Sequence, residues 1–401
     1  MDSIVSNSVL SAHLTDSHRD LQARAVGYFT PEWLDKWRTT AGGPLRREAW
    51  RELAASGYLG VSVPRERGGQ GLGLLGSLVL GEALAGVRDG GIALAMHVQN
   101  EIACDWLVSA RDPALRDRYL PGLLSGELVA CQCDTDPSAE EPATATTAGA
   151  GLVLRGRKKF VINGATADLC FVSALLDGAP AILAVEKSAP GVRVTEVYDK
   201  FGTRAVDSAL VEFDGVRLST DQVVARSGVS QLMRWNRVMS RMRLLIAADA
   251  FFTHRALLEH ITGYVRGRSL GGRPLGAWPV NSHALARARA RQELMEAGIA
   301  DAYLRVTSGG STVPEIAELK WFCVEKANEL AALCTDLEGG AGYMWDSVSL
   351  RAHAQVRGFR MSGGSQTTML TIANHSLACR AELELDPAGR AGHAGEGVRR
   401  G

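Results

Sequence analysis

The stretch Leu152-Val-Leu-Arg-Gly-Arg-Lys-Lys-Phe-Val-Ile-Asn-Gly164 lies between two long helical regions and has the character of β structure. Its residues are mainly β-branched, aromatic or basic, and its closing Asn-Gly pair is typical of a tight turn. Further β-rich runs follow at 181–185 and 209–213, and the pair Asp214-Gly215 after the second run predicts another turn. These runs predict an antiparallel β domain over residues 128–225.

Helical patterns flank this β region on both sides. Before it, helical segments alternate with polar or Gly-rich breaks, so residues 1–127 are predicted to form an α-helical domain. After it, apolar residues within 316–337 recur at three- and four-residue steps, as one buried helix face requires. A second such segment spans 230–265, so we predict a helix bundle over 226–385 and an α+β fold class. The Ala-, Gly- and Arg-rich tail, 386–401, is predicted to be disordered.

Composition excludes some partners. The chain has 401 residues, of which 46% are hydrophobic, enough for two or three domains. Its 44 basic residues balance its 44 acidic residues, so no overall field attracts nucleic acid or an anionic membrane. No segment reaches the roughly 18 uninterrupted apolar residues of a membrane span, and the N-terminus does not resemble a secretory signal. We therefore expect a cytoplasmic protein with neither nucleic acid nor a membrane as partner.

Seven cysteines are scattered along the chain, and only Cys131 and Cys133 lie close together. In a strand these two side chains share a face, but no second Cys or His pair completes a tetrahedral zinc site. We predict reduced, mostly buried thiols and no metal.

Seven short motifs occur in a fixed order along the chain. They are residues 60–73, residues 118–127, Cys133-Asp-Thr-Asp-Pro137, Lys158-Lys-Phe-Val-Ile-Asn-Gly164, residues 200–217, Arg268-Ser-Leu-Gly-Gly-Arg-Pro-Leu275 and Gly339-Gly-Ala-Gly-Tyr343. Each motif alone is weak evidence, but together they resemble the acyl-CoA dehydrogenase family from about Leu59 to Leu383. The resemblance implies an N-terminal helical domain, a middle β domain and a C-terminal helix bundle, with FAD as cofactor.

The resemblance also assigns the cofactor contacts. These are Gln132, Asp134, Thr135, Phe160, Ile162, Arg268, Gly339, Gly340, Gly342 and Ser365. A Gly-rich turn lets backbone N–H groups approach a diphosphate, and an arginine is suited to a phosphate. In the family, the two bundle motifs serve the FAD of a neighbouring subunit, so a homodimer or homotetramer is expected.

The family's catalytic carboxylate is missing from this sequence. In the family reaction a Glu removes the α-proton of an acyl thioester while a hydride passes from the β-carbon to the flavin. By resemblance that Glu position is Gly363, and the alternative position used by some members is Met242, just before Arg243. A flavin-facing hydroxyl residue of the family is replaced by Ile162, which removes a hydrogen-bond donor.

Two residues are candidates for a replacement base. Asp134 stands beside Thr135, and burial against a flavin would raise its pKa toward the range of a general base. The alternative is that Asp134 only hydrogen-bonds a strand turn. His97 is the second candidate, although a histidine in such a position is more often a satisfied core or surface residue.

The predicted substrate contacts come from two regions. Gln99, Asn100 and Glu101 occupy the helix that lines the acyl pocket in the family, and Arg243, Ser362 and Gly363 surround the missing base. If the first three face inward, the substrate is polar, but a helix cannot point every one of these side chains at one cavity.

Three functions remain open from the sequence. The first is α,β-dehydrogenation of a polar acyl thioester, carried by CoA or by an acyl carrier protein, in specialised metabolism of a high-GC bacterium. By resemblance, Glu140 and Glu141 stand where the family has a small residue and a hydroxyl residue beside the thioester. Two carboxylates there would repel a nearby phosphate, and a carrier protein could dock without the usual contacts to the nucleotide phosphate of CoA. The second is a flavin-dependent monooxygenase that uses O₂ and needs no carbon base. The third is a non-catalytic flavoprotein. The sequence does not identify the electron acceptor.

Overall fold

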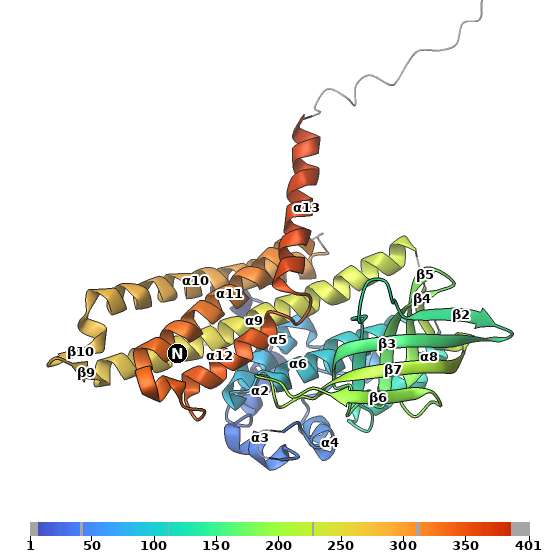
Figure 1. Cartoon of the computed structure of the whole chain (residues 1–401), viewed down its shortest axis with the longest axis horizontal. Coiled ribbons are helices and arrows are strands. Elements are labelled where there is room, and N and C mark those ends of the chain that lie inside the picture. The colour runs from blue at the N-terminus through green and yellow to red at the C-terminus, as the bar shows by residue number, and fades with distance from the viewer. Residues whose placement is uncertain (1–6, 41–42, 111, 227, 310–312, 386–401) are drawn as a thin grey trace, which may run out of the picture.

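The computed structural model describes residues 7–40, 43–110, 112–226, 228–309 and 313–385. Figure 1 shows three parts, which follow one another along the chain: a group of N-terminal helices, a β domain and a bundle of long helices. The predicted α+β class and its three-part order are confirmed. The predicted disordered tail, 386–401, lies outside the described residues.

The N-terminal helices are mostly short. They are α1 (Ser8–Ser11), α2 (Asp16–Ala25), α3 (Pro31–Trp37), α4 (Glu48–Ala55), α5 (Gly73–Leu84), α6 (Gly91–His97), α7 (Cys104–Val108) and α8 (Pro113–Leu124). A π-helical segment, Val98–Ala103, joins α6 to α7 without a break. Two starts show why helices begin where they do: Thr30 and Asp112 cap the first turns of α3 and α8, and each cap is followed by a proline.

The β domain is one eight-stranded sheet. Its strands are β1 (Ala130–Cys133), β2 (Thr144–Ala148), β3 (Gly151–Ile162), β4 (Leu169–Leu176), β5 (Ala179–Glu186), β6 (Val192–Val197), β7 (Ser208–Ser219) and β8 (Val223–Arg226). The order is β6-β7-β3-β2-β4-β5-β8, and β1 also pairs with β4. The predicted antiparallel pairing holds for most strand pairs, but the sheet is mixed, because β1 and β2 both run parallel to β4.

One local feature of the sheet differs from the prediction, and another places the loop of residues 134–143. Asp214 and Gly215 do not form a turn, since they lie inside β7, where the pairing with β3 shifts register. Gly215 has a φ of 68°, which is the conformation that a bulge residue often needs and that glycine supplies. The loop of residues 134–143 leaves β1 and returns as β2 along the same edge of β4, so it stays close to that strand.

The C-terminal bundle is built on a 39-residue helix, α9 (Val229–Gly267). A two-stranded hairpin, β9 (Ser269–Leu270) and β10 (Arg273–Pro274), follows it and leads to α10 (Pro279–Thr307), α11 (Val313–Glu338), α12 (Val348–Phe359) and α13 (Gln366–Leu385). At 1.5 Å per residue, α9 is about 58 Å long. It runs from the β domain to the hairpin at the opposite end of the molecule (Figure 1).

Two hydrophobic cores hold these parts together. The larger one joins the N-terminal helices to the bundle and reaches the sheet at Phe171 and Ala184. The smaller one lies within the β domain and includes Phe213 and Val172. Within the described residues, no helix has the length and apolar character that a membrane crossing requires.

Candidate active site

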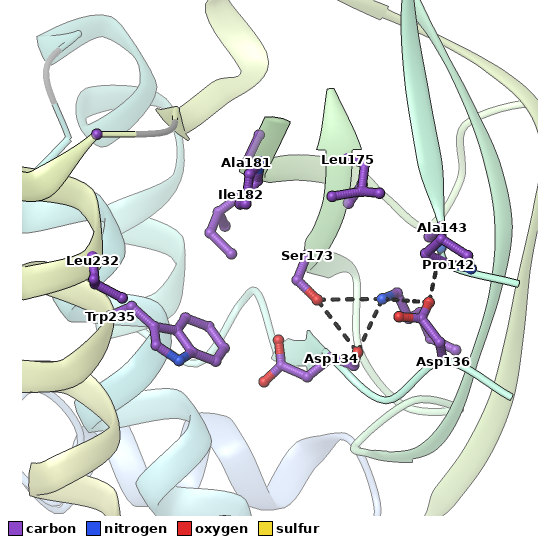
Figure 2. Close-up of a pocket in the computed structure, with 14 residues that line it drawn as sticks. Asp134, Asp136, Pro142, Ala143, Ser173, Leu175, Ala181, Ile182, Leu232 and Trp235 are labelled. Carbon is purple, nitrogen blue, oxygen red and sulfur yellow. Dashed lines mark hydrogen bonds and ion pairs between the residues drawn. The ribbon is translucent and has the colours of Figure 1, made fainter. Parts of the chain in front are cut away.

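A cavity of about 510 Å³ lies between the start of α9 and the β domain (Figure 2). The residues that line it are Asp134, Asp136, Pro142, Ala143, Lys158, Ser173, Ala174, Leu175, Pro180, Ala181, Ile182, Gly228, Leu232 and Trp235. Most of this lining is apolar, and the polar groups gather at the loop that follows β1. The cavity therefore offers an apolar wall with one charged end.

Asp134 supplies the carboxylate at that end. Its side chain points toward the indole of Trp235 on α9 (Figure 2). Burial raises the pKa of this carboxyl to about 6, and Gln132 and Lys158 oppose that rise. The Gln132 side-chain amide donates to Asp134 Oδ1 at 2.7 Å. At neutral pH most of Asp134 is therefore ionised, and it can accept a proton near pH 6.

Lys158 fixes the loop that carries Asp134. This side chain is 1% exposed, and its Nζ forms an ion pair of 2.8 Å with Asp136 Oδ1. The same Nζ donates to the backbone oxygen of Asp134 at 2.9 Å and to Ser173 Oγ at 3.3 Å. Asp136 also accepts from the amide of Ala143 at 2.9 Å, which ties the two ends of the loop together. A buried cation thus holds the loop rigid while Asp136 neutralises its charge.

Thr135 of this loop and Phe160 of β3 are both exposed, and together they are called the platform. The two segments are joined by a hydrogen bond of 2.9 Å from the amide of Lys159 to the oxygen of Thr135. The register between β3 and β7 shifts between Lys158 and Val161, and within this bulge Phe160 takes a φ of 57°. Left-handed backbone is costly for a bulky residue, so its presence points to a functional constraint. The bulge leaves the ring of Phe160 60% exposed.

The loop between α12 and α13 contains two glycines with positive φ, Gly363 at 65° and Gly364 at 101°. Two buried cations hold their carbonyl groups. Arg243 Nε donates to Gly363 O at 3.0 Å, and Lys320 Nζ donates to Gly364 O at 2.9 Å. Burial and the nearby Arg243 lower the pKa of Lys320 to about 7.

The side chains of Ser362 and Ser365, in the same loop, hydrogen-bond the protein backbone. Ser365 Oγ accepts from the amide of Thr368 and so caps the start of α13, and Ser362 Oγ donates to Gly358 O. Met242 is buried, at 3% exposure. The positions where the sequence resemblance placed a catalytic carboxylate therefore hold a methionine and a glycine.

A second set of predicted cofactor residues lies at the far end of the bundle. Arg268 ends α9 just before the hairpin, and Gly339–Tyr343 forms a turn after α11. Glu338 links the two segments, because its carboxylate contacts His260 and its backbone oxygen accepts from Tyr264 at 3.3 Å. These residues lie at the hairpin end of α9, opposite the β domain in Figure 1.

The helix that contains His97 is occupied by structural contacts. His97 is 4% exposed, and its Nε2 lies 2.9 Å from Asp249 Oδ2. Burial disfavours the charged imidazole, but Asp249 outweighs it and raises the pKa of His97. His97 does not line the described cavity, so its geometry favours a structural role over the predicted catalytic one.

The predicted polar substrate contacts on that helix also need revision. The Gln99 side chain bonds the backbone oxygens of Leu123 and Leu128 and accepts from the amide of Ala130. Asn100 accepts from Gly60 N at 2.9 Å and donates to Tyr58 O at 3.1 Å. The reason is that the π-helical turn points both amides at neighbouring loops, where they satisfy buried backbone groups.

Glu101 is used in the same way. Its carboxylate forms a 2.5 Å ion pair with Arg241 of α9 and accepts from Ser77 Oγ of α5 at 2.5 Å. Burial opposes ionisation of Glu101, but Arg241 and Ser77 outweigh it and lower its pKa. Glu101 does face the interior, but its charge is paired within the protein.

Sequence reasoning missed several residues of the site. Lys158 and Trp235 were not singled out, because a lysine in a strand and a tryptophan in a helix carry no local signal of burial around a cavity.

A third thiol, Cys170 on β4, joins Cys131 and Cys133, with the three sulfurs within 4.8 Å of one another. The six cysteines whose side chains are described are buried and free, as predicted.

Comparisons with known proteins agree with this architecture. The N-terminal, middle and C-terminal domain models of acyl-CoA dehydrogenase match residues 15–127, 133–216 and 227–378. The chain belongs to the acyl-CoA dehydrogenase family. Among curated relatives, the mouse mitochondrial long-chain specific acyl-CoA dehydrogenase is 26% identical over 375 residues, covering 88% of this chain and 85% of that protein.

Solved structures of the acyl-CoA dehydrogenase fold superpose closely on this chain. An acyl-CoA dehydrogenase from Geobacillus kaustophilus has a TM-score of 0.84 at 22% identity, covering 91% of this chain and 99% of that one. A glutaryl-CoA dehydrogenase from Mycobacterium smegmatis, solved in complex with FADH₂, has a TM-score of 0.83 at 20% identity, covering 94% and 99%. FAD is the cofactor of this family.

The residues present fit an FAD molecule. A Cβ added to Gly339, Gly340, Gly271 or Gly272 would meet nothing within 4 Å, so the backbone of both turns faces open space. Among the described residues, no hydrogen bond or ion pair engages the exposed guanidinium of Arg268, which suits a phosphate. The platform of Thr135 and Phe160 offers a hydroxyl group and an aromatic ring at the β domain.

Proposed function

We propose that this chain dehydrogenates a polar acyl thioester with FAD, and that Asp134 is the group that accepts the substrate proton. One observation carries the proposal. The carboxylate of Asp134 lies at the charged end of a cavity, with a pKa of about 6, one residue before the Thr135 platform. A general base works best when its pKa is near the working pH and it can reach the proton.

In this reaction FAD supplies the acceptor for the hydride that leaves the β-carbon. Asp134 takes the proton from the α-carbon, so the substrate loses two hydrogens and gains a carbon–carbon double bond. Gln132 and Lys158 hold the Asp134 carboxylate and its backbone, and the apolar wall excludes water from it. We assign Thr135, Phe160 and Ile162 to the flavin end of the cofactor. Gln132 was also predicted to contact the cofactor, but its side-chain amide is engaged by Trp106 and Asp134. Arg268, Gly339, Gly340, Gly342 and Ser365 are assigned to the remainder of the cofactor.

The distance between the platform and the turns at Arg268 and Gly339–Tyr343 supports a homo-oligomer. Trp235 and Arg268 are 33 residues apart on one helix, which is about 50 Å. FAD is too short to touch the platform and Arg268 of the same chain. We therefore propose that two copies contribute to each FAD site.

The charges at the cavity favour a substrate arm without a nucleotide. Asp134 and Asp136 line the cavity, and Glu140 and Glu141 are exposed in the same loop. Lys158 is already paired with Asp136, and carboxylates close to a nucleotide phosphate would repel it. We propose a phosphopantetheine arm on an acyl carrier protein in place of CoA.

The test is anaerobic mixing of the FAD-loaded protein with short polar acyl groups, each presented both on CoA and on a carrier protein. Bleaching of the flavin absorbance by the substrate alone supports dehydrogenation, and faster bleaching by the carrier-bound form supports the second proposal. Asp134→Asn should lower the bleaching rate by about 10²–10⁴-fold, the usual contribution of a general base. Asp35→Asn, at an exposed surface carboxylate, should leave it unchanged. Normal bleaching by Asp134→Asn would remove Asp134 from the mechanism.

A flavin-dependent monooxygenase is the second candidate, and one observation favours it. Neither Met242 nor Gly363 carries a carboxylate, and oxygenation needs no carbon base at those positions. The monooxygenase hypothesis predicts that thioesters alone leave the flavin oxidised. An external reductant would bleach it, and one atom of ¹⁸O₂ would then appear in the product by mass spectrometry.

A further inference from the structure

Asp134 is held by two hydrogen bonds in series, through the side chains of Gln132 and Trp106. Gln132 of β1 donates from Nε2 to Asp134 Oδ1 at 2.7 Å, and its Oε1 accepts from Trp106 Nε1 at 3.0 Å. Trp106 belongs to α7 and is fully buried. Gln132 and Trp106 are absent from the cavity lining, so neither acts by touching a ligand there.

The donor and acceptor of each of these two hydrogen bonds follow from the chemistry of the side chains. An indole N–H can only donate, so the side-chain oxygen of Gln132 must face Trp106. The amide nitrogen of Gln132 must then face Asp134. A glutamine amide would otherwise be free to turn by half a rotation, and the turned form would present an oxygen to the carboxylate. Trp106 therefore selects the orientation that favours a charged Asp134.

The indole of Trp106 is itself held by two neighbouring residues of α9. Its ring stacks on Trp235 of α9, with centroids 6.1 Å apart and planes at 27°. The guanidinium of Arg234 lies 5.3 Å from the ring centroid and donates to Ser109 Oγ at 2.6 Å. Trp106 of α7 is thus packed against two residues of α9, and its N–H cannot leave Gln132 without disturbing that packing.

We infer that Trp106 and Gln132 are positioning residues, which aim the Asp134 carboxylate at the cavity and keep it charged. This inference rests on the role proposed for Asp134. The other groups that face Asp134 are Lys158 from β3, Asp136 from its own loop and Ser173 from β4. Lys158 is shared with Asp136, and the hydrogen bond from Gln132 opposes the rise in the pKa of Asp134 more than that from Ser173 does.

The experiment measures the Asp134 carboxyl directly. FAD-loaded protein with ¹³C-labelled aspartate is titrated by infrared difference spectroscopy, and the Asp134 band is assigned by its loss in Asp134→Asn. Trp106→Phe keeps the ring and removes the donor. In that variant the pKa of Asp134 should rise by about one pH unit or more, as expected for loss of a hydrogen bond to a charged group. Gln132→Met should produce a similar rise.

Two further variants make the result decisive. Combining Trp106→Phe with Gln132→Met should add little to either single change, because both act on one path. Trp33→Phe is the matched control: its buried indole nitrogen has no hydrogen-bond partner among the described residues, so the Asp134 titration should not move. An unchanged titration in Trp106→Phe would overturn the inference.

The outcome also separates this inference from the proposed function. If Asp134→Asn bleaches normally while Trp106→Phe still shifts the titration, the positioning is real and the base assignment fails. If Asp134→Asn is inactive and the titration does not shift, the base assignment stands and the positioning fails.

Discussion

The terminal methyl group of Ile246 lies 2.8 Å from the point where a Cβ atom on Gly363 would stand. Gly363 also has a φ of 65°, which costs about 1–2 kcal/mol for any residue with a side chain. The backbone conformation therefore favours glycine at the family's base position, and any larger residue there would also require the end of the Ile246 side chain to move.

Gly363→Ala should lower the free energy of unfolding by about 2 kcal/mol, measured by urea denaturation. Adding Ile246→Ala would remove the close contact but not the φ constraint. As a comparison, Gly263→Ala lies in α9 with open space around its Cβ, and it should stabilise the protein by about 1 kcal/mol. A Gly363→Ala protein as stable as the unmodified chain would show that this loop can rearrange.

Arg268→Ala should weaken FAD retention by about tenfold or more, because a charge-assisted contact to phosphate is lost. The measurement is flavin released on gel filtration, followed by titration of the apoprotein with FAD. Arg266→Ala is the control, since Arg266 is an exposed arginine in the last turn of the same helix. Equal FAD affinity in the two variants would take Arg268 out of the cofactor site.

Glu101→Gln should lower the free energy of unfolding by about 3 kcal/mol, because it leaves Arg241 without its partner in the interior. Glu127→Gln removes a carboxylate that pairs with Arg51 at the exposed surface, and it should cost below about 1 kcal/mol. A small effect of Glu101→Gln would reopen the possibility that Glu101 is held for a ligand.

The difference between local and long-range features explains where sequence reasoning succeeded and where it failed. The helix periodicity of α11 and the β-rich run of β3 are local, so both elements could be predicted. The parallel pairing of β1 with β4 depends on residues almost 40 positions apart, and no local pattern reports it.

The candidate site divides in the same way. Asp134, which lines the cavity, was singled out because it departs from the family pattern at a known position. Lys158 and Trp106 gain their roles only from tertiary packing. The orientation of Gln99 and Asn100 depended on a π-helical turn, which rotates side chains away from the positions that a regular helix would give.

His254 gives a prediction about pH. It is fully buried in α9, and burial lowers its pKa to about 4 from the usual 6.5. Between these values the unfolded chain binds more protons than the folded one, so stability is complete above about pH 6.5 and falls as the pH drops toward 4. The loss from this one residue is about 3 kcal/mol.

His254→Leu should flatten that part of the stability profile, measured as the free energy of unfolding at several pH values. His283→Leu changes an exposed histidine and should leave the slope in place. Parallel profiles for the His254 variant and the unmodified protein would mean that other groups produce the acid sensitivity.

The length of α9 has a consequence for how the holoenzyme behaves on dilution. Under the proposed assignment of the cofactor residues, the length of α9 separates Arg268 from the platform of Thr135 and Phe160, so a lone subunit would hold only part of each cofactor. Flavin content should therefore depend on protein concentration, with dilution releasing FAD and added FAD driving the subunits back together. FAD would then hold the subunits together as well as take part in the reaction.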